Sequence, residues 1–255
     1  MAALVRRLVQ LYVGLALYGF GIGLQVSSGL GNDPWDVFHQ GLARVTGLSI
    51  GTWIIIVALL VMLLWIPLRQ RPGVGTVSNA VLIGVFADLS LALLPDPHGL
   101  VMRWTYLIAA VLVGAFATGC YIGAGLGPGP RDGLTIGLAA RGHSIRVVRT
   151  AIELSVLAVG WLLGGTVGIG TLVYAVSIGP LTHVLIPALA IKPRGRARRT
   201  EPVPVRTRPH PQPKEAGTAG LRFVQRDPRR DSGHAGTYRG LRADRRHAER
   251  GAGRP

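Results

Sequence analysis

Two aspartates occupy matching places in the chain and are the first candidates for chemistry. Asp36 lies in GLGNDPWDVFHQGLA (29–43) and Asp132 in GLGPGPRDGLTIGLA (125–139), which share 8 of 15 positions at a shift of 96 residues. In both segments a proline stands two residues before the aspartate, which is typical of a helix start where a carboxylate meets free backbone N–H groups. These aspartates either stabilise two helix starts or form a pair that binds a cation or proton at membrane depth.

Three further ionisable side chains, Asp88, Glu153 and His183, fall inside long apolar stretches. Asp88 aligns with His183 at a shift of 95, and Glu153 has a helix-spaced partner in Arg149, four residues earlier. Each of the three also has a structural explanation without a role in binding. Glu153 can simply pair with Arg149, and Asp88 can lie near the outer surface. His183 can bond to a backbone carbonyl that a proline kink frees. The candidate solute- or ion-binding residues are therefore Asp36, Asp88, Arg131, Asp132, Arg149, Glu153 and His183.

Catalytic and cofactor signatures do not occur in this sequence. It has no nucleophile–base pair, no metal-ligand cluster and no dinucleotide fingerprint, and His39 has no matched His or Cys neighbour. The GxGT turns at 73–76 and 168–171 lack the lysine of a phosphate loop. A carboxylate-based intramembrane enzyme would need two acids close together, whereas Asp36 and Asp132 are expected to enter from opposite sides. We therefore expect a protein that is not an enzyme and has no cofactor or metal.

The elements that must position these residues are membrane helices. Of the 255 residues, 49% are hydrophobic and only 16% are charged, well below the roughly 25% of a soluble domain. Runs of about 20 apolar residues predict transmembrane helices. Six such spans are expected, at 8–27, 50–68, 74–94, 104–124, 147–163 and 169–190.

Two shorter segments, 34–46 and 130–141, each begin with a proline and carry the paired aspartates. Both are too short to cross a bilayer as a helix, so each is expected to be an interfacial helix or a re-entrant half-helix.

A second matching block, GVGTVSNAVLIG (73–84) and GIGTLVYAVSIG (168–179), shares 7 of 12 positions at a shift of 95. Two blocks in the same order predict two repeats, at 5–94 and 103–191, each with three spans and one short helix. Because three is odd, the second copy must be inverted in the membrane, as in many transporters. The expected fold is thus all-α and polytopic, with six transmembrane helices in two inverted three-helix repeats.

The positive charge of the chain is uneven. The formal net charge is +16, but residues 192–255 hold 18 of the 28 Lys and Arg residues. We expect a membrane domain over 1–191 and a basic, disordered cytoplasmic tail over 192–255, without nucleic-acid binding. With both termini inside, Arg44 and Arg103 alone lie outside, while Arg131 and Arg149 join the other arginines inside. The expected location is the inner membrane, with N- and C-termini cytoplasmic.

The motifs GLGxxPWD, TGLSIGTW, PLRQRPGVGT, GPRDGL and GGTVGIGT resemble the YczE/YyaS/YitT group of bacterial integral membrane proteins over about residues 10–190. The resemblance implies a polytopic inner-membrane protein without an established activity, and it brings no catalytic residues.

Two functions are compared on the residues themselves. The favoured one is a transporter of a small solute or ion, with its site between the inverted repeats. The alternative is a non-transporting membrane partner or regulatory scaffold, because GxxxG pairs at 19–23, 119–123 and 160–164 can pack helices internally or in a homodimer. The expected partners are the lipid bilayer, a small solute or ion, and a second copy of the chain.

Overall fold

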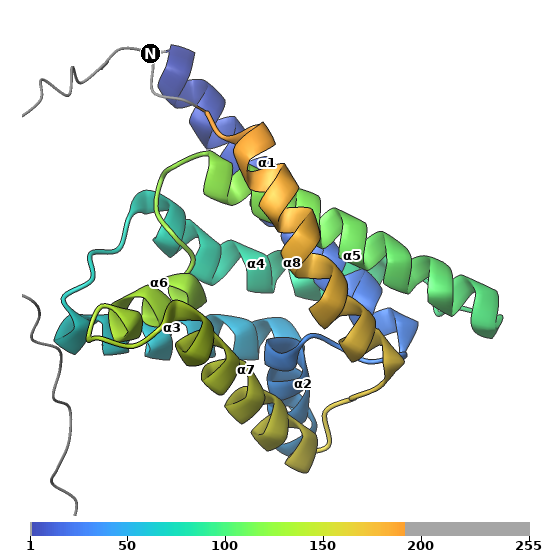
Figure 1. Cartoon of the computed structure of the whole chain (residues 1–255). Coiled ribbons are helices and arrows are strands. Elements are labelled where there is room, and N and C mark those ends of the chain that lie inside the picture. The colour runs from blue at the N-terminus through green and yellow to red at the C-terminus, as the bar shows by residue number, and fades with distance from the viewer. Residues whose placement is uncertain (1, 192–255) are drawn as a thin grey trace, which may run out of the picture. The chain divides into compact units, whose positions relative to one another are not determined.

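The computed structural model describes residues 2–191, which form eight α-helices and no strand (Figure 1). The predicted tail, 192–255, lies outside the described residues. The helices are α1 (Ala2–Ser28), α2 (Pro34–Thr46), α3 (Ile50–Leu68), α4 (Val74–Leu93), α5 (Gly99–Gly123), α6 (Pro130–Ala139), α7 (Ile145–Leu162) and α8 (Ile169–Leu189).

Five helices of the described part, α1, α3, α4, α5 and α8, are long and apolar enough to cross a membrane. The sixth span, expected at 147–163, corresponds to α7, which is 18 residues long and carries Arg146, Arg149 and Glu153. Those charges set α7 apart from the other long helices, so a crossing by α7 stays a prediction.

The two short helices begin where their prolines predict. In α2, Pro34 takes the first helical position, and the Asp33 side chain accepts a hydrogen bond from the backbone N–H of Asp36 at 2.7 Å. In α6, Pro130 takes the same position after Gly129, which has no side chain to cap with. Because the start signals are local, the sequence sufficed to locate both helices.

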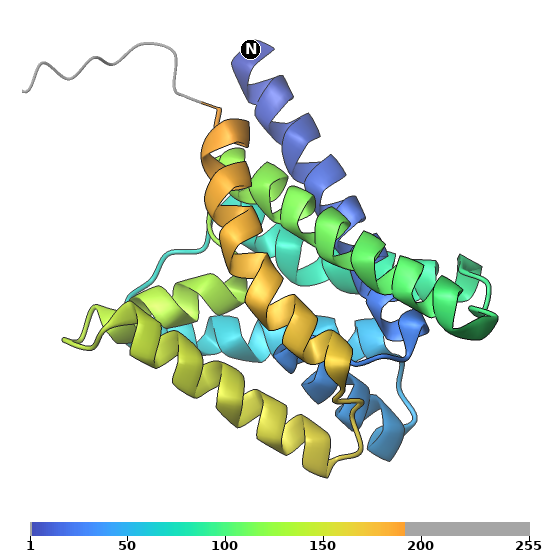
Figure 2. The same cartoon turned by 45° about the vertical axis from the view of Figure 1, so that its right-hand side comes forward.

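Helix α1 runs through the centre of the described residues, between α4 and α5 (Figures 1 and 2). Gly14 of α1 faces Cys120 of α5, and Gly21 faces Gly114, so α1 and α5 are antiparallel. On its other side, Gly19 and Gly23 of α1 meet Ala87 and Ser90 of α4, so these two helices are parallel. The close approach of the backbones explains why small residues are concentrated here.

The second half repeats this arrangement. Gly119 and Gly123 of α5 lie against Leu185 and Leu189 of α8, which runs parallel to α5 as α4 runs parallel to α1. Two of the GxxxG pairs, 19–23 and 119–123, therefore contact helices of the same chain. The third pair begins with Gly160, which packs on the backbone of Val37 and Phe38 in α2.

Each short helix packs on a helix from the other half: α2 on α7 and α6 on α3. The loop before each short helix likewise contacts the start of a long helix in the other half. Gly170 N–H donates to Leu30 O at 2.8 Å, and Gly75 N–H donates to Leu126 O at 3.0 Å. Leu30 matches Leu126 and Gly75 matches Gly170 in the sequence repeat, so the same hydrogen bond occurs twice with the halves exchanged.

The interfaces α2–α7 and α6–α3 differ in which helix supplies the glycine at the contact. In one, the glycine is on the long helix, since Gly160 of α7 faces the backbone of Val37 and Phe38 in α2. In the other, the glycine is on the short helix, since Gly133 of α6 faces the ring of Trp65 in α3. Val37 matches Gly133, and Trp65 matches Gly160, so the glycine lies on opposite partners in the two interfaces.

The halves differ in how their last two helices pack. Helix α3 lies along α4, with Gly51 close to Gly84, and Asp88 of α4 accepts hydrogen bonds from Ser49 Oγ at 2.5 Å and Gly51 N–H at 2.7 Å. Helix α7 does not pack along α8 in this way within the described residues. The start of α3 is therefore tied to α4, while α7 is separated from α8.

The two ends of the described chain lie together. Arg7 in α1 donates to Ile191 O at 3.4 Å, and Gln10 donates to Leu189 O at 2.8 Å (Figure 2). The start of α1 and the end of α8 are consequently at the same end of the helix bundle.

Candidate functional site

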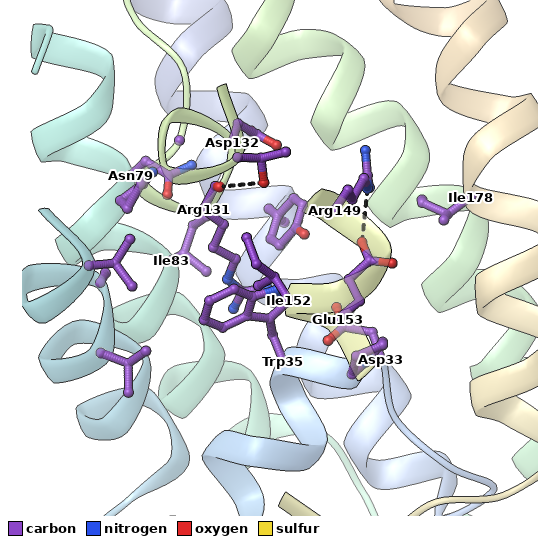
Figure 3. A pocket seen from close by; sticks show the side chains of 18 of the residues that line it. Asp33, Trp35, Asn79, Ile83, Arg131, Asp132, Arg149, Ile152, Glu153 and Ile178 are labelled. Carbon is purple, nitrogen blue, oxygen red and sulfur yellow. Dashed lines mark hydrogen bonds and ion pairs between the residues drawn. The ribbon is translucent and has the colours of Figure 1, made fainter. Parts of the chain in front are cut away.

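The starts of the two short helices meet inside the protein. Arg131 extends from the first turn of α6 across the first turn of α2, where its guanidinium lies 4.8 Å from the centre of the Trp35 ring (Figure 3). Arg131 Nη2 is also 3.8 Å from Asp36 Oδ1. Trp35 and Arg131 are matching positions of the sequence repeat, so the halves contact each other through equivalent residues.

A cavity of about 530 Å³ surrounds this contact, which is within the usual range for a small-molecule site. Both short helices contribute to it, together with α1, α3, α4, α5, α7 and α8. Several repeat-matched pairs line it: Pro34 with Pro130, Trp35 with Arg131, His39 with Thr135, Asn79 with Tyr174, and Ile83 with Ile178.

The two long walls of the cavity differ in chemistry. The α3 wall is formed by Ile54, Val57, Ala58 and Val61 and is apolar. The α7 wall has Ile145, Arg149, Ile152 and Glu153, and Arg149 Nε donates to Glu153 Oε1 at 2.9 Å. The pair predicted from the spacing of Arg149 and Glu153 is therefore present, and it borders the cavity (Figure 3).

A buried polar cluster forms the first turns of α2. Asp36 and His39 are each 1% exposed, and His39 Nδ1 lies 3.2 Å from Asp36 Oδ1. Three buried atoms in this segment have no hydrogen-bond partner: Asn32 Oδ1, Asp36 Oδ2 and His39 Nε2. Unpaired buried polar atoms are costly and rare, so this cluster requires an explanation.

Asp33 precedes α2 and lies outside the long helices. Burial raises the pKa of its carboxyl to about 6; the Asp36 carboxylate also raises it, while the Arg131 guanidinium lowers it. On the other side of the cavity, Asp132 Oδ2 accepts a hydrogen bond from the Tyr121 hydroxyl at 2.9 Å. Tyr121 in turn meets Tyr18 edge to face, with ring centres 6.0 Å apart.

Five of the seven predicted site residues come together. Arg131, Asp132, Arg149 and Glu153 line the cavity, and Asp36 contacts Arg131 beside it. The other two do not belong to this site. Asp88 binds the start of α3, and His183 lies on an exposed face of α8.

Arg131, which the orientation argument counted with the arginines of the inner face, contacts Asp36 and Trp35 at the cavity. Sequence reasoning also overlooked Tyr18, Asn79, Tyr121 and Tyr174, which line the cavity. Asn79 and Tyr174 had a usable signal, since they occupy matching places just after the two GxGT turns.

These features define an all-helical, multi-pass membrane protein with a charge-lined cavity between its helices. The chain belongs to the family described as "Family of unknown function (DUF6198)", which matches residues 5–187.

Three curated relatives are similar to this chain. An uncharacterised protein of Haemophilus influenzae is 41% identical over 184 residues, covering 72% of this chain and 84% of its own. The uncharacterised membrane protein YczE of Bacillus subtilis is 35% identical, covering 78% and 95%. The uncharacterised protein YyaS of Bacillus subtilis is 30% identical, covering 69% and 90%. No solved structure matches the chain.

Proposed function

We propose that this protein is a small-solute transporter of the bacterial inner membrane, in which the solute binds in the cavity between two inverted halves. The observation that carries the proposal is the meeting of both short-helix starts at one cavity bordered by Arg131, Asp132, Arg149 and Glu153. Charged side chains at membrane depth are costly and usually mark a solute or ion pathway. Broken or short helices in corresponding places of two halves are also typical of transporter sites.

The helix directions support an inverted repeat. Helices α1 and α5 are the first helices of the two halves and run antiparallel, while each is parallel to the last helix of its own half. The exchanged contacts of α2 with α7 and of α6 with α3 are those expected when one half is turned over relative to the other. In this arrangement α2 and α6 are re-entrant half-helices that approach the cavity from opposite faces.

The position of the chain ends supports six spans. Five crossings would place the start of α1 and the end of α8 on opposite faces, whereas Arg7 contacts Ile191. A crossing by α7 restores an even number. Its charges do not oppose this, because Arg149 and Glu153 pair with each other at the cavity.

The proposed orientation does not depend on Arg131. With both termini cytoplasmic, the loop arginines Arg69, Arg71 and Arg141 lie inside together with Arg6 and Arg7. Only Arg44 and Arg103 lie outside, as the preference for positive charge on the cytoplasmic side requires.

The direct test is flux into proteoliposomes. Purified protein is reconstituted, and uptake of a panel of labelled amines, carboxylates, sugars and inorganic cations is compared with uptake by protein-free vesicles. We expect saturable uptake of at least one class. No flux above the protein-free vesicles for any class would contradict the transporter and favour the membrane-scaffold alternative.

A variant pair links flux to the cavity. Arg131→Gln removes the cation that joins α2 and α6, and uptake should fall at least about tenfold because a charged, partly buried contact is lost. Arg71→Gln changes an exposed loop arginine and should leave uptake unchanged. Monodisperse elution of both variants in detergent controls for folding. Equal uptake by both variants would dissociate transport from the cavity.

A further inference from the structure

The charges that face the cavity are not balanced among themselves. Arg149 is paired with Glu153, and Arg131 is paired with Asp36. Asp33 and Asp132 also line the cavity, and within residues 2–191 neither has a basic side chain within ion-pair distance. Two carboxylates therefore remain without a cationic partner.

Their hydrogen bonds leave acceptor capacity free. Asp33 Oδ1 accepts the N–H of Asp36, and Asp132 Oδ2 accepts the hydroxyl of Tyr121. Each carboxylate keeps a second oxygen that has no hydrogen bond from another described residue. An ionised carboxylate only accepts hydrogen bonds, so both groups require a donor.

The unpartnered atoms of α2 point to the same chemistry. His39 lines the cavity and is 1% exposed, and its Nε2 has no partner. When a neutral imidazole donates its Nδ1–H to Asp36 Oδ1, Nε2 is left as an acceptor. Asp36 Oδ2 beside it is also an unsatisfied acceptor. Both unpartnered atoms, His39 Nε2 and Asp36 Oδ2, are therefore hydrogen-bond acceptors.

The aromatic lining favours a cation as well. Tyr18, Tyr121 and Tyr174 line the cavity, and tyrosine faces attract cations. The same region already holds one cation over an aromatic ring, since Arg131 lies over Trp35.

A bare metal ion and an anion fit less well. The described residues contain no group of three His, Cys, Asp or Glu side chains that can hold a metal, and 530 Å³ is far more than one ion fills. Short-helix starts favour anions, but here they already face the side chains of Asp33, Asp36 and Asp132.

We propose that the solute is a small organic cation with a protonated amine, held among the cavity tyrosines by the negative charge of Asp33 and Asp132. This proposal rests on the proposed function, whose cavity it uses. An ammonium supplies three donors and one positive charge, which match the acceptor surplus and the two unpaired carboxylates. Asp132 is one of the repeat-matched aspartates, while Asp33 matches Gly129 and is present in one half only.

The test is binding of four matched probes to the full chain in detergent, measured by calorimetry and by thermal shift. The probes are butylamine, butan-1-ol, butyrate and sodium ion. Butylamine should bind, and the alcohol, the carboxylate and sodium should bind at least about tenfold more weakly, because only the amine brings charge and N–H donors. Butyrate binding tighter than butylamine would overturn the proposal.

Isosteric variants localise the site. Asp132→Asn and Asp33→Asn remove one negative charge each while keeping size, and Asn still caps α2 well. Each should weaken butylamine binding at least about tenfold. Asp96→Asn, in the exposed α4–α5 loop, is the matched control and should bind normally. Unchanged binding in both cavity variants would also overturn the proposal.

The two proposals can fail separately. Butylamine binding that depends on Asp132, together with no flux for any class, would refute the transporter and retain the amine site. Saturable carboxylate flux that Arg131→Gln abolishes would retain the transporter and refute the amine.

Discussion

At the residue scale, the least usual feature is a carboxyl group whose charge depends on pH near neutrality. Asp33 lies among Asp36 and His39 of α2 and Arg131 of α6, and burial raises its pKa to about 6. Because the pKa is raised, the carboxylate is present above pH 6 and becomes neutral as the pH falls through this value.

Amine binding should follow this titration. Butylamine affinity should be highest above about pH 7 and should fall as the pH is lowered through 6 towards 5, because Asp33 loses its charge. Calorimetry across this range measures the slope. Asp33→Asn should bind weakly at all these pH values and lose most of the pH dependence. A pH profile of the Asp33→Asn variant parallel to that of the unaltered protein would assign the titration to another group.

A second residue-scale prediction concerns Gly31, in the loop before α2. Its φ is +119°, and a Cβ there would lie 2.6 Å from Gly168 N. Gly31→Ala should therefore cost on the order of 1–3 kcal/mol in free energy of unfolding in detergent. Gly114→Ala is the control, since a Cβ at Gly114 in α5 meets nothing within 4 Å. Equal free energies of unfolding for the two variants would contradict this prediction, because the loop would then accommodate the added Cβ without strain.

At the scale of elements, the two halves are packed differently at matching places. Ser49 and Asp88 join α3 to α4. Their matches in the second half are Ser144 and His183, on helices that lie apart. The cavity is bordered by α7 residues such as Ile152 and α8 residues such as Ile178, on the two sides of that separation. A transporter with inverted halves would exchange the two packings during its cycle.

Cross-linking tests this exchange. The double variant Ser144→Cys, His183→Cys is made in a Cys120→Ala background. A short thiol cross-linker should join the two cysteines only during transport of solute, when α7 closes on α8. Ser49→Cys with Asp88→Cys is the control and should cross-link at rest, since these side chains are in contact. Absence of the first cross-link under transport conditions would contradict this cycle.

At the scale of the whole molecule, the proposed transport function and the proposed amine site both depend on the six-span, inverted topology. The proposed six-span topology places the α4–α5 loop and the α7–α8 loop on the outer face and the α6–α7 loop on the inner face. With Cys120 replaced by alanine, His98→Cys and Val167→Cys should react with a membrane-impermeant maleimide in intact cells. His143→Cys should react only after permeabilisation. All three positions are exposed. Labelling of His98→Cys and Val167→Cys from opposite faces would exclude the inverted arrangement.

The sequence by itself determined the local elements. Helix α2 begins at Pro34 and ends at Thr46 as predicted, and α3, α4 and α8 agree with their expected bounds within one residue. Helices α1 and α5 begin six and five residues earlier than expected. Apolar runs, prolines and caps lie next to the residues that they organise, so no distant contact is needed to recognise them. The aligned blocks also identified matching positions, because a repeat is a property of the sequence.

Only the tertiary structure decided which of these positions meet. Asp132 and Asp88 look equally functional in sequence, yet one borders the cavity and the other binds the start of α3. From the sequence, Arg131 is interpreted as a surface charge. In the structure, α2 and α6, which are 96 residues apart in the chain, meet and place Arg131 over Trp35. Such contacts depend on how the helix faces pack, and Gly133 against Trp65 is one of the fits that fixes them. No local pattern in the chain encodes that fit.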